Sequence, residues 1–207
     1  CQLMRIGIDF DNTIVCYDGL FHCIALERSL IDETVPVSKQ AIRDYLRRCG
    51  LETEWTKLQG LVYGARMNEA EAYPGVIDFI SKFLQAGAKI SIISHKTKIP
   101  YAGPPYDLHA TATDWLSKYK IGVAGVFEAI TIDFELTRED KLQKIRTRNC
   151  SIFVDDLPEF LNEPAFPIQT QKILFDPNDI NKNDNRYLRV NSWSQITEFL
   201  KSKTHAG

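Results

Sequence analysis

The feature that most constrains the fold is a set of short apolar segments, rich in β-branched residues, that alternate with helix-like stretches. Nearly continuous apolar runs of this length are typical of strands buried on both faces of a parallel sheet. The four clearest strands are predicted at residues 3–10, 89–94, 129–133 and 151–156, with a fifth at 172–175. Helices are predicted between or before them, at residues 74–86, 107–119 and 137–146. This order predicts an α/β fold with an open, Rossmann-like, doubly wound parallel sheet.

The stretch after the first strand interrupts this alternation. It contains three helix-like patterns without a strand between them, at residues 21–30, 38–48 and 52–66. Ser38 is suited to cap the second of these helices. We therefore expect a small helical domain at residues 16–73. It would be inserted into an α/β core domain formed by residues 1–15 and 74–207.

The composition is that of a globular chain and argues against some functions. The chain has 207 residues, 44% hydrophobic and 25% charged, and a net charge of −2. A near-neutral balance gives no basic excess for binding nucleic acid. No apolar run is long enough to cross a bilayer and no secretory leader is recognisable, so we expect a cytoplasmic protein that does not bind membranes. Five cysteines without a C-x-x-C pair indicate neither a disulfide framework nor a zinc site.

Oxygen-bearing side chains follow three of the predicted strands. They are Asp9 and Asp11, Ser94, and the pair Asp155 and Asp156. Because the carboxyl ends of parallel strands face one crevice, we expect these side chains to converge. Two carboxylates about 4 Å apart repel by about 4 kcal/mol at an effective dielectric near 20, so a cation must lie among them. Oxygen ligands without His or Cys favour Mg²⁺.

Together these segments resemble the haloacid dehalogenase (HAD) superfamily, and in particular its aspartyl phosphatases. The family's apolar strand followed by D-x-D-x-T is present as IGIDFDNT at residues 6–13. A strand ending in Ser or Thr is matched by ISIIS, ending at Ser94, and a strand ending in paired acids by IFVDD, ending at Asp156. The remaining motif, a lysine near a helix start, is best matched by Lys141 in REDKLQKI. All four occur in the family's order.

The resemblance implies a role for each matched residue. Asp9 would attack phosphorus and form a phosphoaspartyl intermediate, which divides one hydrolysis into two easier displacements. Asp11 would first protonate the leaving alcohol and then deprotonate the attacking water. Ser94 and Lys141 would bind the non-bridging phosphate oxygens, where charge accumulates during transfer.

The resemblance also implies a magnesium site and a reaction class. Asp9, the backbone carbonyl of Asp11 and Asp156 would hold Mg²⁺, with Asp155 supporting the site. Dehalogenases of this family lack an acid two residues after the nucleophile, and its ion-pumping ATPases carry lysine directly after it. Asp11 and Phe10 match neither pattern.

Some assignments have alternatives in the sequence. Lys144 lies three residues beyond Lys141 on a similar helical face, and Lys96 lies close to Ser94. His95, next to Ser94, is equally consistent with a substrate contact and with an ordinary loop histidine.

The helical insertion resembles the family's cap domain located between the first and second motifs. Such caps close over the site, exclude water and select the substrate. Candidate specificity residues in this insertion are Tyr17, His22, Arg43, Arg47, Trp55, Tyr63 and Arg66.

The resemblance thus implies an Mg²⁺-dependent phosphatase of a small phosphorylated metabolite, such as a sugar phosphate or a nucleotide, acting as a monomer or homodimer. A phosphoryl transferase or phosphomutase would use the same nucleophile but pass the phosphoryl group to a sugar hydroxyl. A non-catalytic binding domain would keep the fold without turnover. The Asp9 and Asp11 pair argues against this last reading, because binding alone does not require both acids.

Overall fold

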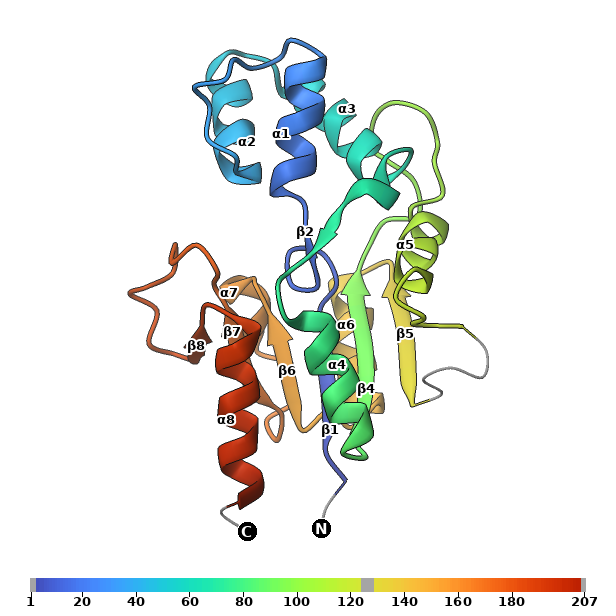
Figure 1. Ribbon diagram of the computed structural model, residues 1–207, viewed down its shortest axis with the longest axis vertical. Helices are drawn as coiled ribbons and strands as arrows, with labels where there is room; N and C mark the ends of the chain where they lie inside the picture. Colours follow the sequence, from blue (N-terminus) through green and yellow to red (C-terminus); the bar gives the residue numbers. More distant parts are fainter. Residues whose placement is uncertain (1–2, 124–128, 206–207) are drawn as a thin grey trace. The chain divides into compact units, whose positions relative to one another are not determined.

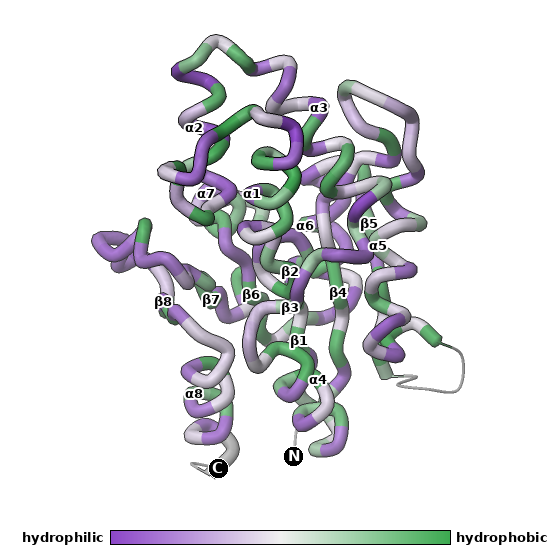
Figure 2. The backbone as a smooth tube through the Cα atoms, turned by 45° about the horizontal axis from the view of Figure 1, so that its top comes forward, coloured by the Kyte–Doolittle hydropathy of each residue, from purple (hydrophilic) through white to green (hydrophobic). Residues whose placement is uncertain are grey.

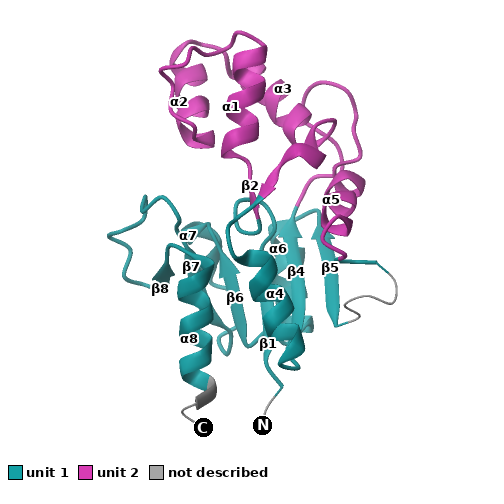
Figure 3. Ribbon diagram, in the orientation of Figure 1, with its two compact units in different colours: residues 1–14, 72–95, 121–207 teal, residues 15–71, 96–120 magenta. Residues whose placement is uncertain are grey.

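A computed structural model describes residues 3–123 and 129–205, and its α/β architecture confirms the predicted fold class. The chain divides into two compact units (Figure 3). The first consists of residues 1–14, 72–95 and 121–207, and the second of residues 15–71 and 96–120. No helix in the described ranges is long and apolar enough to cross a membrane.

The first unit is built around a six-stranded parallel sheet in the order β5-β4-β1-β6-β7-β8 (Figure 1). The central strand β1 pairs on one side with β4 and on the other with β6, so that Ile8 lies between Ile92 and Val154. The strands are β1 (Arg5–Ile8), β4 (Lys89–His95), β5 (Ile130–Glu135), β6 (Ile152–Asp155), β7 (Gln171–Phe175) and β8 (Leu188–Val190).

Helices cover both faces of this sheet. In Figure 1, α4 (Val76–Gln85) and α8 (Trp193–His205) lie in front of the strands and α6 (Arg138–Thr147) lies behind them. The ring of Trp193 packs between Phe79 and Phe175, with ring centroids 4.8 Å and 5.6 Å apart. On the opposite face, α6 and the short helix α7 (Pro158–Leu161) bury an apolar cluster. Its members are Ile93, Leu142, Ile145, Cys150, Phe153, Phe160, Leu161, Phe166 and Leu174.

Strand β1 approaches this cluster closely at Gly7. A Cβ atom there would lie 2.5 Å from Phe153 Cδ2 and 2.9 Å from Cys150 Sγ. Any larger residue would therefore displace a buried ring. The absence of a side chain at position 7 allows β1 to pack closely against the cluster. The first acidic residues follow directly after β1.

The second unit is mainly helical. Its helices are α1 (Asp18–Glu27), α2 (Lys39–Arg48), α3 (Glu52–Tyr63), the 3-10 helix η1 (Met67–Glu69) and α5 (Leu108–Ser117). The short strands β2 (Val15–Cys16) and β3 (Glu71–Ala72) pair with each other. Ser38 caps α2 as the sequence predicts, because its Oγ accepts a hydrogen bond of 3.2 Å from Ala41 N.

Residues 96–120 join the helical unit through close contacts with α3 and with Gly64, the residue that follows it. A Cβ atom at Gly60 would lie 2.9 Å from the carbonyl oxygen of Ala102, and one at Gly64 would lie 2.5 Å from Tyr106. The loop after β4 therefore packs directly on the α3 backbone. The helical insertion predicted at residues 16–73 overlaps the first segment of this unit, and the contribution of residues 96–120 has no counterpart in that prediction.

Hydropathy follows the elements along the chain (Figure 2). Figure 2 shows hydrophobic stretches in β1 and β4, whereas the connection between β7 and β8 is mostly hydrophilic. All residues from 177 to 185 are exposed or half-buried, in agreement with their Asn- and Asp-rich sequence. This loop lies outside the core.

Candidate active site

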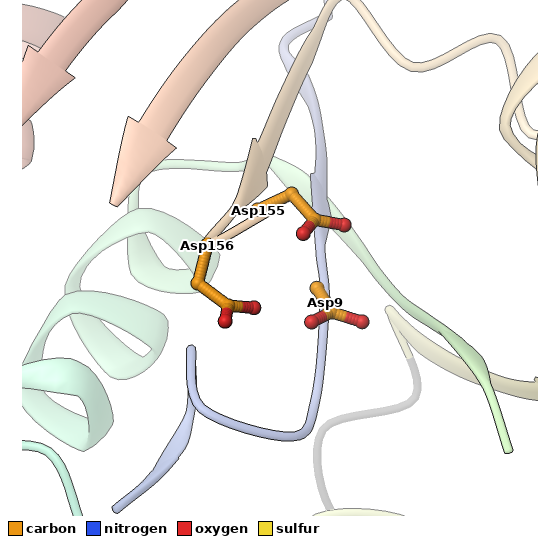
Figure 4. Close-up of side chains that lie close together, drawn as sticks. All are labelled: Asp9, Asp155 and Asp156. Atoms are coloured by element: carbon orange, nitrogen blue, oxygen red, sulfur yellow. The ribbon is translucent and has the colours of Figure 1, made fainter. Parts of the chain in front are cut away.

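Three aspartates from two neighbouring strands meet at the carboxyl edge of the sheet. Asp9 directly follows β1, and Asp155 and Asp156 come at the end of β6, the strand paired with β1. The backbone continues this pairing, since Asp9 N donates to Val154 O at 2.9 Å. One carboxylate oxygen from each aspartate lies within 4.8 Å of the others (Figure 4). Parallel pairing of β1 and β6 is thus what gathers these acids.

An ammonium group lies inside this acidic cluster. Lys141 Nζ donates to Asp9 Oδ1 at 2.9 Å and to Asp155 Oδ2 at 2.7 Å. The same nitrogen lies 4.0 Å from the ring centroid of Phe160. Thr137 fixes the start of α6 by accepting a hydrogen bond from Asp140 N, so Lys141 projects from the first turn of a capped helix. The lysine is bound on two sides by acids and on another by an aromatic ring.

The two alternative lysines have other surroundings. Lys144 pairs with Asp133 at 3.7 Å and with Glu135 at 3.4 Å. Lys96 belongs to the second unit, where its ammonium lies 4.9 Å from the ring centroid of Tyr63. Lys141 is the lysine that the structure places among the three aspartates.

The cluster is short of positive charge. Three carboxylates and one ammonium leave a formal charge of −2. Burial, together with repulsion from Asp155, raises the pKa of Asp9 from 3.8 to about 7, although Lys141 acts in the opposite direction. Burial alone would lower the pKa of Lys141, but its attraction to Asp155 and Asp9 outweighs this and raises the pKa above its ordinary value. A divalent cation would neutralise this excess.

The donor set fits Mg²⁺. The three converging ligands are all carboxylate oxygens, which a small hard cation prefers. Thr13 supports two of them, because its Oγ1 lies 3.4 Å from Asp9 Oδ2 and 3.3 Å from Asp156 Oδ1. The side chain of Asp11 is not a member of the converging group, and the contribution predicted for this residue is its backbone carbonyl.

A cavity of about 110 Å³ opens onto these groups. Its lining residues are Asp9, Asp11, Asn12, Ser94, His95, Arg138, Lys141, Asp156, Leu157 and Phe160. Since about 10–15 Å³ of such space is enough for one water, the cavity has room for a group of phosphate size. Every lining residue belongs to the first compact unit.

Ser94 lines this cavity, and its buried hydroxyl is unsatisfied. Its side chain is 1% exposed, and within residues 3–123 and 129–205 its Oγ has no hydrogen-bond partner. Leaving a buried polar atom unpaired costs about 1–3 kcal/mol. An oxygen of a bound ligand would satisfy this donor.

The structure thus brings the predicted site residues to one place. Asp9, Asp11, Ser94, Lys141 and Asp156 line the cavity, and Asp155 is joined to it through Lys141. Three of the other lining residues were not predicted from the sequence: Arg138, Leu157 and Phe160. Arg138 lies one helical turn before Lys141, a spacing that is visible in the sequence, whereas nothing in the sequence singles out Phe160.

The candidate specificity residues of the helical insertion fall into different classes. Tyr17 and Trp55 are 1% and 2% exposed and belong to the core of the second unit. His22 Nε2 lies within hydrogen-bond distance of a backbone carbonyl, and Tyr63 is half-buried. The three arginines form surface ion pairs; they are Arg43, Arg47 and Arg66.

Comparisons with solved structures identify similar folds across almost the whole chain. A dehalogenase is 13% identical, with 96% of this chain and 97% of that chain covered and a TM-score of 0.58. A hydrolase from Streptococcus pneumoniae TIGR4 is 12% identical, with 97% and 100% covered and a TM-score of 0.57. YfnB from Bacillus subtilis, described as a HAD hydrolase and bound to magnesium, is 12% identical, with 97% and 99% covered and a TM-score of 0.54.

At these identities the similarity shows the fold. No protein-family model matches the sequence, and a search of curated proteins finds no match. The α/β fold predicted from the alternation of strands and helices is confirmed by these solved structures.

Proposed function

We propose that this chain, which has the fold of the haloacid dehalogenase hydrolases, is an Mg²⁺-dependent phosphomonoester hydrolase that acts through a phosphoaspartyl intermediate on Asp9. One observation carries the proposal: a cavity of phosphate size is lined by converging carboxylates, a buried lysine and an unsatisfied serine hydroxyl. Because a dehalogenase has the same fold, the fold does not decide the reaction, and these groups in the cavity are what favour phosphoryl transfer.

In the first step, Asp9 acts as the nucleophile. A carboxylate oxygen of Asp9 forms a bond to phosphorus while the bond from phosphorus to the ester oxygen breaks. Asp11, which lines the same cavity, gives its proton to the leaving oxygen. Lys141 holds Asp9 through Oδ1, and Thr13 lies beside Oδ2, so the carboxylate is oriented on both sides.

In the second step, water replaces Asp9 on phosphorus. The Asp11 carboxylate takes a proton from the attacking water, the new oxygen–phosphorus bond forms, and the bond to Asp9 breaks. Inorganic phosphate leaves, and both aspartates return to their starting states. The same residue serves as acid and then as base, which requires it to change protonation once in each step.

The negative charge of the phosphoryl group is stabilised by protein side chains whose positions are fixed before the substrate binds. Ser94 Oγ donates to a non-bridging oxygen, and the Lys141 ammonium attracts the same group. Asp9, Asp156 and the backbone carbonyl of Asp11 would hold Mg²⁺, supported by Asp155. The ion would offset the repulsion between the aspartates and the phosphate.

The size of the cavity supports a small phosphorylated metabolite as the substrate. Its volume of about 110 Å³ accommodates the phosphoryl group, and the remainder of a small ester would extend toward the rim. His95 and Leu157 line the cavity and are exposed, which places them where the rest of a substrate would pass.

Hydrolysis of p-nitrophenyl phosphate tests the proposal. We expect turnover with Mg²⁺, loss of turnover in EDTA, and recovery when Mg²⁺ is restored. Asp9→Asn is the matched variant, because it changes one oxygen to nitrogen in the cavity and removes the nucleophile. Turnover that persists in EDTA, or in Asp9→Asn, would contradict the proposal. An added sugar that diverts the phosphoryl group from inorganic phosphate would identify a transferase.

A further inference from the structure

We propose that Arg138 binds a second anionic group of the substrate, a carboxylate or a second phosphate separated from the transferred phosphoryl group by a short spacer. This inference rests on the proposed function and narrows its substrate class. Arg138 lines the same cavity as Asp9, Ser94 and Lys141.

The position of Arg138 follows from the start of α6. It is the first residue of the helix after the Thr137 cap, and Lys141 follows one turn later. Residues three apart on a helix have Cβ atoms about 5–6 Å apart on the same face. The guanidinium and the ammonium therefore approach one cavity from adjacent turns of one helix.

The two cations differ in their surroundings. The Lys141 side chain is 5% exposed and lies between Asp9 and Asp155. The Arg138 side chain is 43% exposed. The buried Lys141 and Ser94 are the groups that the proposed function assigns to the transferred phosphoryl group. Arg138 then faces the remainder of the ester at the rim.

The guanidinium retains hydrogen-bonding capacity. In the described ranges, its ion-pair partner is Glu163, with Nη2 and Oε1 3.4 Å apart, and no hydrogen bond to the protein is formed. Arg148, at the other end of α6, shows the contrast. It donates two hydrogen bonds of 2.9 Å to Asp133. A guanidinium with unused N–H groups matches the planar or tetrahedral oxygens of carboxylate and phosphate, which it binds through two parallel hydrogen bonds.

The shared cavity limits the ligand. Because Arg138 and Lys141 line one cavity of about 110 Å³, an anion bound by Arg138 must be joined to the transferred phosphoryl group by a short spacer. Glu163 would hold Arg138 in place until such an anion competes for it. A large, uncharged leaving group would gain nothing from this arginine.

Paired substrates test the inference in the intact protein with Mg²⁺. Phosphoglycerate is compared with glycerol phosphate, and propanediol bisphosphate with propanediol monophosphate. We expect kcat/KM to favour the doubly anionic member by about tenfold or more in at least one pair, which is the usual contribution of charged hydrogen bonds. Preference in the first pair identifies a carboxylate, and preference in the second identifies a phosphate.

Variants then test whether Arg138 causes the preference for the doubly anionic substrate. Arg138→Gln should remove it, mainly by raising KM for the doubly anionic substrate, and Arg138→Lys should restore part of it. Lys144→Gln is the matched control, since it removes a positive charge from the same helix outside the cavity lining; it should keep the preference. Glu163→Gln should also keep it, whereas a purely structural ion pair predicts equal losses in Arg138→Gln and Glu163→Gln.

The outcomes separate this inference from the proposed function. Hydrolysis of p-nitrophenyl phosphate without discrimination in either pair overturns the inference alone. Equal losses of both members of a pair in Arg138→Gln also overturn it, because Arg138 would then bind the transferred group. Failure to hydrolyse any phosphate ester with Mg²⁺ overturns the proposed function, and the inference with it.

Discussion

Asp9→Asn is expected to stabilise the metal-free protein at neutral and alkaline pH while removing its activity. Asp9 is 5% exposed, and its pKa lies at about 7 in the folded protein against an ordinary value of 3.8. At pH values between these two pKa values, the Asp9 carboxyl is protonated in the folded protein and ionised in the unfolded chain. Stability therefore falls as the pH rises through this window, and the full cost of burying the charge is present above it.

The size of this stabilisation follows from the linkage between protonation of Asp9 and folding. A carboxyl whose pKa rises from 3.8 to about 7 costs the folded protein roughly 4 kcal/mol once it is ionised in both states, and roughly 2 kcal/mol near pH 5. Asparagine has nearly the same shape and carries no charge. We therefore expect the stability advantage of Asp9→Asn to grow by roughly 2 to 3 kcal/mol between about pH 5 and about pH 8.

Urea unfolding in EDTA, monitored by circular dichroism at each pH, measures this advantage. Asp140→Asn is the control, because this acid lies on the exposed first turn of α6 and its charge stays in water in both states. Mg²⁺ should reverse the order at high pH by binding the wild type more tightly. Unfolding free energies of wild type and Asp9→Asn that run parallel across the pH range would refute the reasoning.

Three further substitutions probe the site and its support. Ser94→Ala should lower kcat/KM for p-nitrophenyl phosphate by roughly 10- to 100-fold without loss of stability, because its Oγ has no protein partner in the described ranges; a clear fall in Tm would contradict this. Lys141→Met should destabilise the protein by about 3–5 kcal/mol in urea, since it leaves Asp9 and Asp155 buried without their cation, and an unchanged midpoint would argue against the buried pair. Gly7→Ala should cost about 1–3 kcal/mol through overlap with Phe153, and an unaltered Tm would show that the cluster relaxes easily.

The sequence predicted the part of the fold that depends on long, regular patterns. Strands β1, β4, β6 and β7 are buried apolar runs, and their positions were recognisable for that reason. Strand β8 has three residues, and β2 and β3 have two each, which is too short for a periodic pattern. Helix α8 was not predicted, although Trp193, Ile196 and Leu200 are buried at helical spacing.

The choice of lysine and the place of the loop after β4 could not be predicted from the sequence, because both depend on tertiary contacts. Lys141 and Lys144 have similar local sequence, and the choice between them depends on which acids each meets across the sheet. The loop at residues 99–106 contains no helical or strand pattern. Its place in the helical unit depends on Gly60 in α3 and Gly64 directly after α3, which are distant in sequence.

The most direct test of the central claim is the identification of the phosphorylated residue. Asp11→Asn and wild type are incubated with p-nitrophenyl phosphate and Mg²⁺, quenched in acid, digested and analysed by mass spectrometry. An aryl leaving group needs little help from an acid, whereas the attack of water does, so the intermediate should accumulate in Asp11→Asn. We predict one added phosphoryl group on the peptide that contains Asp9, and none in Asp9→Asn. Release of nitrophenol with the Asp9 peptide unmodified, or with the phosphoryl group on another residue, would contradict the account.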